Sequence, residues 1–163
     1  MDYFRNKTFW LLFIAVIIRG WFAWDYQVRS IPDTREYYET GRQIIFGELE
    51  NYSGKRPPVY PIITAMAGFD PVNLALINVL MGLSITVMLF RIFKILSGND
   101  WMGLAAGMCY AVNPSLILYE FTVSSETASV FFLTLSVFLF IPILTDNKNN
   151  SRRRMILLCL ATA

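Results

Sequence analysis

Long runs of apolar residues, separated by short polar segments, constrain this chain more than any other feature of its sequence. The first run, at about 8–24, reads TFWLLFIAVIIRGWFAW, and further runs cover about 72–95, 102–118 and 127–144. Each is roughly as long as a helix that crosses a hydrocarbon layer of about 30 Å. The sequence therefore predicts an all-α fold, a polytopic membrane helix bundle of about four to five spans.

The composition agrees with this class and excludes some chemistry. Charged residues make up 16% of the chain, against about 25% in a typical soluble domain. Histidine is absent, which removes histidine catalysis and the commonest metal ligand. A bound cation would need oxygen ligands, which favours magnesium or manganese, but no residue is assigned to a metal. The net charge of +2 argues neither for nor against nucleic acid. The basic residues lie at the span boundaries and form no single broad face, and we predict no nucleic-acid partner.

The end of the chain and its two cysteines carry less information. A fifth apolar segment begins at Met155 and stops at Ala163, too short to cross a membrane. We therefore treat residues 1–163 as a single transmembrane module, the front part of a longer bundle or one that partner membrane proteins complete. Cys109 and Cys159 lie inside apolar segments and are expected to be small buried side chains without a disulfide.

The positions of Lys and Arg predict the orientation of the bundle. Basic residues predominate at the N-terminus, in the turn at about 91–101 and in the segment 145–154, which holds Arg152–Arg154. Short loops rich in Lys and Arg remain in the cytoplasm. The N-terminus is therefore expected to be cytoplasmic and the loop 25–70 to face outward. The uncleaved first span makes this an integral protein of a bacterial or archaeal plasma membrane, or of an equivalent organelle membrane.

The outward loop 25–70 is too long to be an ordinary linker and carries two helical patterns. Residues 34–46, TREYYETGRQIIF, alternate apolar and charged faces with helical spacing. A short apolar stretch, 59–69, follows the pair Pro57-Pro58, which favours a helix start. We expect two helices at the membrane surface.

Two groups of polar residues in this loop are candidates for chemistry. Asp33 precedes the first loop helix, and its spacing from Glu36 is typical of a capping box, which on spacing alone is the preferred interpretation. The functional alternative is a general base that takes a proton from an acceptor hydroxyl or amine. Lys55 and Arg56 precede the proline pair and suit an anion site, although isolated basic residues more often contact lipid headgroups.

Three further features lie in or near the spans. Glu126 follows Ser124 and Ser125, where a carboxylate favours a helix start or, alternatively, faces the same cavity as Asp33. Arg19 lies near the outer end of the first run, and we favour its pairing with an acidic residue inside the bundle over snorkelling. Gly103 and Gly107 form a GxxxG pattern, best explained by close helix packing.

Taken in order, these motifs resemble a known family. They comprise Pro32-Asp33-Thr34, Tyr37, Gly41, Gly47, Arg56-Pro57-Pro58, Tyr60-Pro61, Asn113-Pro114 and, more weakly, Ser125-Glu126-Thr127. The ordered set resembles the N-terminal module of GT-C fold glycosyltransferases, in particular the protein O-mannosyltransferase and aminoarabinose-transferase group. Such enzymes carry further spans, so the resemblance covers only their front part.

The resemblance implies a reaction and a division of roles. It implies a membrane glycosyltransferase that moves a sugar from a polyprenyl-phosphate donor to an acceptor on the non-cytoplasmic face. Asp33 would be the catalytic base and Arg56, with Lys55, would bind the carrier phosphate. Tyr37 and Tyr60 would shape the pocket, and Glu126 would be a second acidic group. The alternative is a non-catalytic membrane subunit that packs in a larger complex.

Overall fold

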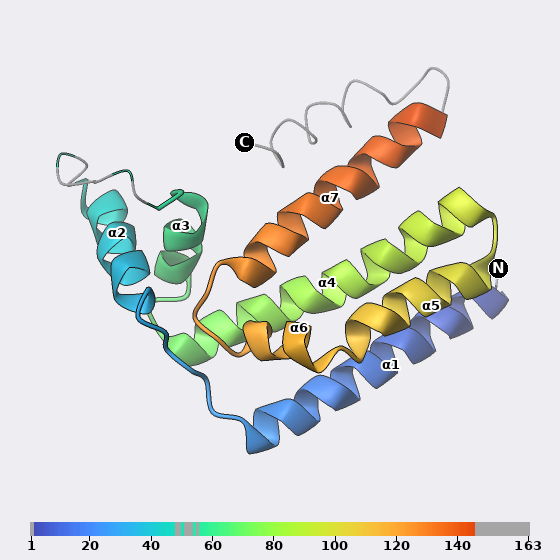
Figure 1. Ribbon diagram of the computed structural model, residues 1–163, viewed down its shortest axis with the longest axis horizontal. Coiled ribbons are helices and arrows are strands. Elements are labelled where there is room, and N and C mark those ends of the chain that lie inside the picture. Colours follow the sequence, from blue (N-terminus) through green and yellow to red (C-terminus); the bar gives the residue numbers. More distant parts are fainter. Residues whose placement is uncertain (1, 48–49, 51–53, 55, 146–163) are drawn as a thin grey trace.

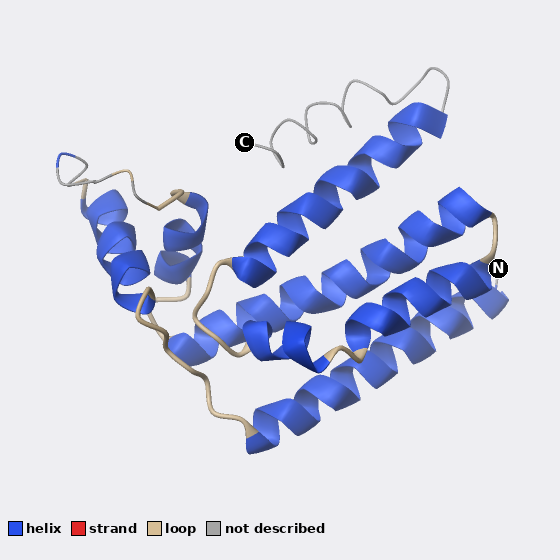
Figure 2. Ribbon diagram, viewed as in Figure 1, coloured by secondary structure: helices blue, strands red, loops and turns tan. Residues whose placement is uncertain are grey.

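The computed structural model describes residues 2–47, 50, 54 and 56–145, and in these residues the regular structure is entirely helical (Figures 1 and 2). The prediction of an all-α helix bundle is confirmed. The helices are α1 (Asp2–Asp25), α2 (Thr34–Phe46), α3 (Val59–Met66), α4 (Pro71–Ser97), α5 (Asp100–Ala111), α6 (Pro114–Glu120) and α7 (Glu126–Thr145). The short segment predicted at 155–163 lies outside the described residues.

Two of these helices are long and apolar enough to cross a membrane, Lys7–Asp25 within α1 and Pro71–Ser97. The bent pair of α5 and α6 makes a third span if the two helices are counted together, and the apolar part of α7, Glu126–Ile141, is shorter. The long helices α1, α4, α5 and α7 lie side by side as the bundle (Figure 1). The predicted spans thus correspond to helices of this bundle.

The stretch expected as one span at 102–118 is divided in two. Asn113 follows the end of α5 and caps α6. Its Oδ1 accepts hydrogen bonds from the backbone N–H groups of Ser115 at 3.0 Å and of Leu116 at 3.4 Å. Pro114 begins α6, and a residue before proline is disfavoured in helical geometry. The axes of α5 and α6 therefore differ by 59°, and α6 is directed differently from the helix that precedes it.

Close approach of helices in the bundle depends on glycine, as the GxxxG pattern predicted. A methyl group added to Gly103 would lie 2.5 Å from the backbone oxygen of Phe90 in α4. One added to Gly107 would lie 2.8 Å from Leu11 in α1. The two glycines therefore let α5 pack tightly between α4 and α1. Cys109, on another face of α5, is exposed rather than buried as expected, because the helix turns this residue away from its neighbours; Cys159 is not among the described residues.

Helices α2 and α3 pack together at one end of the bundle, beside the first turns of α4 and α7 and away from the N-terminus (Figure 1). Gly41 of α2 faces α3, where a methyl group would lie 2.7 Å from the backbone oxygen of Pro61. α2 ends at Gly47, whose φ of 75° is the left-handed geometry that glycine favours. Both helices predicted in the loop 25–70 are present, although the second ends at Met66 rather than at 69.

Candidate active site at the α2–α3 end of the bundle

Asp33 lies at the start of α2, but its carboxylate does not cap the helix. Its backbone is already helical, with φ −70° and ψ −17°, and its side chain makes no capping hydrogen bond. A cap residue normally has extended geometry that turns its side chain back over the first N–H groups. The capping box expected for Asp33 and Glu36 is therefore wrong. Both carboxylates are directed to a third residue instead.

That residue is Arg56, which precedes the proline pair before α3. Its Nη2 donates to Asp33 Oδ1 at 2.7 Å, and its Nε donates to Glu36 Oε2 at 2.9 Å. The Arg56 side chain is 26% exposed, and the two carboxylates are nearly half exposed. The hydrogen bond to Glu36 is the main cause that raises the pKa of Arg56 above its ordinary value, with Asp33 acting in the same direction. The guanidinium is therefore a permanent cation that solvent can reach.

Two tyrosines continue inward from this ion-pair cluster. The Arg56 guanidinium lies over the ring of Tyr37, 5.1 Å from its centroid, a cation–π distance. Tyr37 in turn contacts Tyr60 edge-on, with centroids 4.8 Å apart, and its hydroxyl lies 3.2 Å from Ser125 Oγ. The structure thus brings together four of the predicted site residues: Asp33, Arg56, Tyr37 and Tyr60.

Tyr60 forms the inner wall of this cluster. It is buried, and burial raises the pKa of its phenol well above the ordinary value. Its hydroxyl makes no hydrogen bond of good geometry, although Asn78 and the backbone of Ser124 lie near enough to oppose the rise in pKa. The Asn78 Oδ1 and Ser124 Oγ atoms are buried and unsatisfied as well. Tyr60 is therefore a neutral group at physiological pH, suited to packing rather than to proton transfer.

The other two predicted site residues contribute less to this geometry. Glu126 begins α7, as its acidic character predicted, and its side chain is exposed. Its neighbour Ser125 is the residue that contacts Tyr37, so the role of Glu126 as a second acidic group stays a prediction. Lys55 lies outside the described residues.

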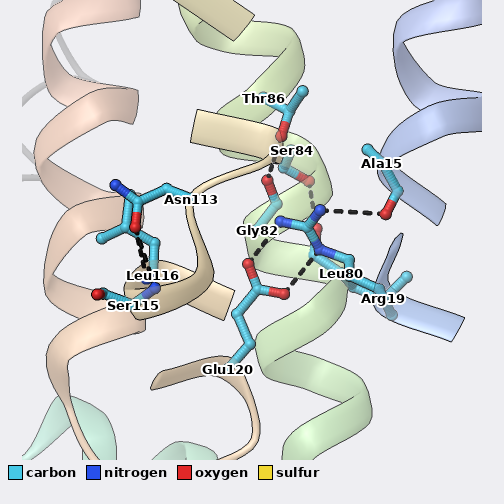
Figure 3. A network of polar contacts seen from close by, with 10 residues as sticks. All are labelled: Ala15, Arg19, Leu80, Gly82, Ser84, Thr86, Asn113, Ser115, Leu116 and Glu120. Carbon is cyan, nitrogen blue, oxygen red and sulfur yellow. Dashed lines mark hydrogen bonds and ion pairs between the residues drawn. The ribbon is translucent and has the colours of Figure 1, made fainter. Parts of the chain in front are cut away.

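A second ion pair, inside the bundle, confirms the partner expected for Arg19. Arg19 of α1 donates from Nε to Glu120 Oε2 at 2.7 Å and from Nη2 to Glu120 Oε1 at 2.6 Å (Figure 3). Both side chains are at most 2% exposed. Several acidic residues lie near this end of the bundle, among them Asp25, Asp70, Glu120 and Glu126, and their spacing in the sequence does not distinguish them as partners of Arg19. The bend at Pro114 turns Glu120 inward, which is why the pair forms there.

The charges of this end of the molecule do not form an evident metal site. Among the described residues, no group of three or more Asp, Glu or Cys side chains is arranged to hold an ion. Asp33 and Glu36 both face Arg56, which occupies the space between them. The magnesium or manganese considered from the sequence stays a prediction. Chemically, the cluster offers a carboxylate for proton transfer and a guanidinium for an anion, side by side.

A protein-family match covers most of the chain. Residues 55–163 match the family model described as dolichyl-phosphate-mannose-protein mannosyltransferase. The matched segment contains Arg56, Tyr60 and Glu126, whereas Asp33 and Tyr37 precede it. No curated protein and no solved structure matches the chain.

Proposed function

Because the chain belongs to the dolichyl-phosphate-mannose-protein mannosyltransferase family, we propose that it is a membrane glycosyltransferase that takes a sugar from a polyprenyl-phosphate carrier. The family description suggests mannose as the sugar and a protein hydroxyl as its acceptor. Apolar helices and family together make the chain an integral membrane protein.

The contact between Asp33 and Arg56 carries this proposal. A transfer from a lipid phosphate needs a base at the acceptor and a cation at the leaving group, on opposite sides of the sugar's reacting carbon. The two side chains meet at 2.7 Å although they come from different elements. Both are accessible, since the Asp33 carboxylate is 45% exposed. A base and an anion-binding group in one accessible place support a transferase rather than a purely structural subunit.

The proposed reaction is a single displacement at the anomeric carbon. The Asp33 carboxylate takes the proton from the acceptor hydroxyl, and the acceptor oxygen forms the new bond to the sugar. The bond between that carbon and the carrier phosphate breaks, and the phosphate leaves with the electron pair. Arg56 stabilises the charge that develops on the leaving phosphate, because a fixed guanidinium in a partly dehydrated site needs little reorganisation.

Without a donor, Arg56 is engaged by Asp33 and Glu36. A bound phosphate would compete with these carboxylates for the guanidinium. Its arrival would weaken the hold of Arg56 on Asp33 and leave that carboxylate a better acceptor for a proton. Donor binding and activation of the base are in this way coupled through one side chain. Tyr37, under the guanidinium, would keep Arg56 at the site during this exchange.

We place the α2–α3 end of the bundle on the non-cytoplasmic face. At the opposite end, Lys94 and Lys7 lie 2.7 Å and 3.9 Å from Asp100, and Lys7 covers the ring of Trp101 at 4.2 Å. Basic residues are typical of a cytoplasmic membrane boundary, and tryptophan is enriched at both membrane interfaces. The candidate site would then face the compartment to which lipid-linked sugars are delivered.

The test is transfer by the purified protein in lipid nanodiscs, with radiolabelled mannose supplied on polyprenyl phosphate and a peptide rich in serine and threonine as acceptor. A parallel reaction supplies the same sugar on a nucleotide. The proposal predicts a labelled peptide from the lipid-linked donor alone. Labelling from the nucleotide sugar alone would contradict the donor class, and no labelling from either would favour the alternative of a non-catalytic subunit.

A further inference from the structure

The buried pair of Arg19 and Glu120 is held in one geometry by several contacts. Its two hydrogen bonds are short and parallel, and Arg19 Nη1 also donates to the backbone oxygen of Ala15 at 3.2 Å (Figure 3). A methyl group on Gly82 of α4 would overlap the Glu120 carboxylate and lie 3.0 Å from Arg19 Nη2. The pair therefore joins α1 to α6 across a surface of α4 that only glycine leaves open.

Glu120 is the last residue of α6, so its position fixes the start of the α6–α7 loop (residues 121–125). This loop pairs with the segment that leads from α1 to α2. Arg29 donates its N–H to Phe121 at 3.0 Å and accepts from the N–H of Val123, also at 3.0 Å. Asn78 Nδ2 of α4 donates to the backbone oxygen of Thr122 at 3.4 Å. The loop is thus held by backbone hydrogen bonds to Arg29 and by the Arg19–Glu120 ion pair directly before its first residue.

The same loop supports the candidate active site. Thr34 Oγ1 lies 3.5 Å from the backbone oxygen of Val123, and Ser125 Oγ lies 3.2 Å from the Tyr37 hydroxyl. Thr34 follows Asp33 directly in the sequence, and the ring of Tyr37 makes the cation–π contact with Arg56. Displacement of the loop would therefore move both Asp33 and the surface on which Arg56 rests.

We propose that Arg19 and Glu120 are positioning residues, whose ion pair sets the place of the α6–α7 loop and through it the alignment of Asp33 with Arg56. The effect on transfer rests on the proposed function, whereas the effect on the loop does not. Neither residue touches the Asp33–Arg56 cluster in the described contacts. The ion pair orients α6 and the loop that follows it, and adds little to the stability of the fold. Replacement of a buried ion pair by apolar side chains of similar size often leaves the stability unchanged or raises it.

The experiment uses the double variant Arg19→Met/Glu120→Leu, which removes both charges and leaves no buried ion unpaired. The matched control is Lys94→Met/Asp100→Leu, which removes an ion pair between α4 and α5 at the opposite end of the bundle. Three quantities are measured in nanodiscs: the unfolding temperature, amide hydrogen exchange of peptides that contain Arg29 and residues 121–125, and kcat and KM for transfer.

The inference predicts an Arg19→Met/Glu120→Leu protein that unfolds at the wild-type temperature or above, exchanges the Arg29 and Val123 amides at least about tenfold faster, and loses about tenfold or more in kcat. The control should change neither exchange at residues 121–125 nor kcat. Wild-type exchange in the double variant would overturn the inference, whatever the activity. If the wild-type protein transfers no sugar while exchange behaves as predicted, the proposed function fails and the loop placement stands.

A double variant that does not fold is replaced by Arg19→Lys, which keeps the charge but not the paired geometry. Wild-type amide exchange in that variant would equally overturn the inference.

Discussion

Arg56 donates from Nη2 to Asp33 Oδ1 at 2.7 Å, which joins the residue before the proline pair that precedes α3 to the residue directly before α2. Glu36 accepts from the same guanidinium at 2.9 Å. The Asp33 carboxylate therefore does not cap the helix. Arg56 is held by two carboxylates, which a phosphate can replace as partners of the guanidinium. This relationship makes the α2–α3 end of the bundle a candidate site for transfer from a phosphate-linked donor.

Replacement of Arg56 by lysine should weaken donor binding while the charge is retained. Lysine offers a point charge, whereas arginine contacts two acceptors at once in a fixed geometry. We expect Arg56→Lys to raise the KM for the lipid-linked donor by about tenfold, equivalent to the loss of one charge-assisted hydrogen bond of about 1.5 kcal/mol. Arg35→Lys is the control, because Arg35 lies on α2 but pairs with exposed Glu39 at 2.7 Å. Equal KM values in the two variants would remove Arg56 from the donor site.

Tyr60→Phe should leave stability near neutral pH almost unchanged, because the lost hydroxyl makes no good hydrogen bond. We expect a difference below about 1 kcal/mol, whereas Tyr60→Ala should cost about 3–5 kcal/mol through loss of the packed ring. The raised pKa of Tyr60 adds a pH dependence. Above pH of about 10 the unfolded phenol ionises while the folded one stays protonated, so stability falls as pH rises.

Thermal unfolding followed between pH 7 and 11 tests this pair of effects. The wild-type protein should lose more stability above pH 10 than Tyr60→Phe does. Identical pH profiles would show that the Tyr60 phenol ionises as readily in the folded state as in the unfolded chain.

Gly82→Ala should destabilise the bundle, because its methyl group would overlap the Glu120 carboxylate. Overpacking of this kind costs about 1–3 kcal/mol, or several degrees in Tm. Gly20→Ala provides the contrast, since a methyl group there meets no atom within 4 Å and alanine favours a helix by up to about 1 kcal/mol. Differential scanning calorimetry of the two variants measures the difference; a Gly82→Ala protein as stable as Gly20→Ala would mean that the ion pair relaxes without cost.

A membrane-impermeant maleimide tests the proposed orientation in intact cells. In a background with Cys109 and Cys159 replaced by serine, Arg35→Cys introduces a thiol on the exposed face of α2, where Arg35 is 86% exposed. Ser97→Cys introduces one at the opposite end of the bundle. We expect labelling of Arg35→Cys from outside and of Ser97→Cys only after permeabilisation, and the reverse pattern would invert the topology.

Sequence patterns were sufficient for the elements of this fold because hydrophobic runs and turn residues are local signals. The run predicted at about 72–95 corresponds to α4, and Asp70 caps this helix: its side chain accepts from the N–H groups of Val72 and Asn73 at 2.8 and 2.9 Å. The helical pattern predicted at 34–46 likewise ends directly before Gly47, which closes α2. The run 102–118 was predicted as one span although it contains Asn113-Pro114, because hydropathy alone does not distinguish a bent span from a straight one.

The pairing of side chains was harder to predict, because it depends on directions in space. The spacing of Asp33 and Glu36 fits a capping box, and only the approach of Arg56 from another element explains why both carboxylates turn away from the helix. Arg19 required some acidic partner, yet the choice of Glu120 follows from the 59° bend between α5 and α6. Long-range contacts of this kind leave no periodic trace in a single sequence.

The rate of sugar transfer by Asp33→Asn at saturating donor tests the central claim most directly. Asparagine keeps the size of the side chain and an oxygen that can accept from Arg56, but it cannot take a proton. With Glu39→Gln as the control on the solvent face of α2, the account predicts a kcat at least about 100-fold below wild type for Asp33→Asn and within about twofold for the control. A kcat for Asp33→Asn equal to that of the control would contradict the assignment of Asp33 as the base.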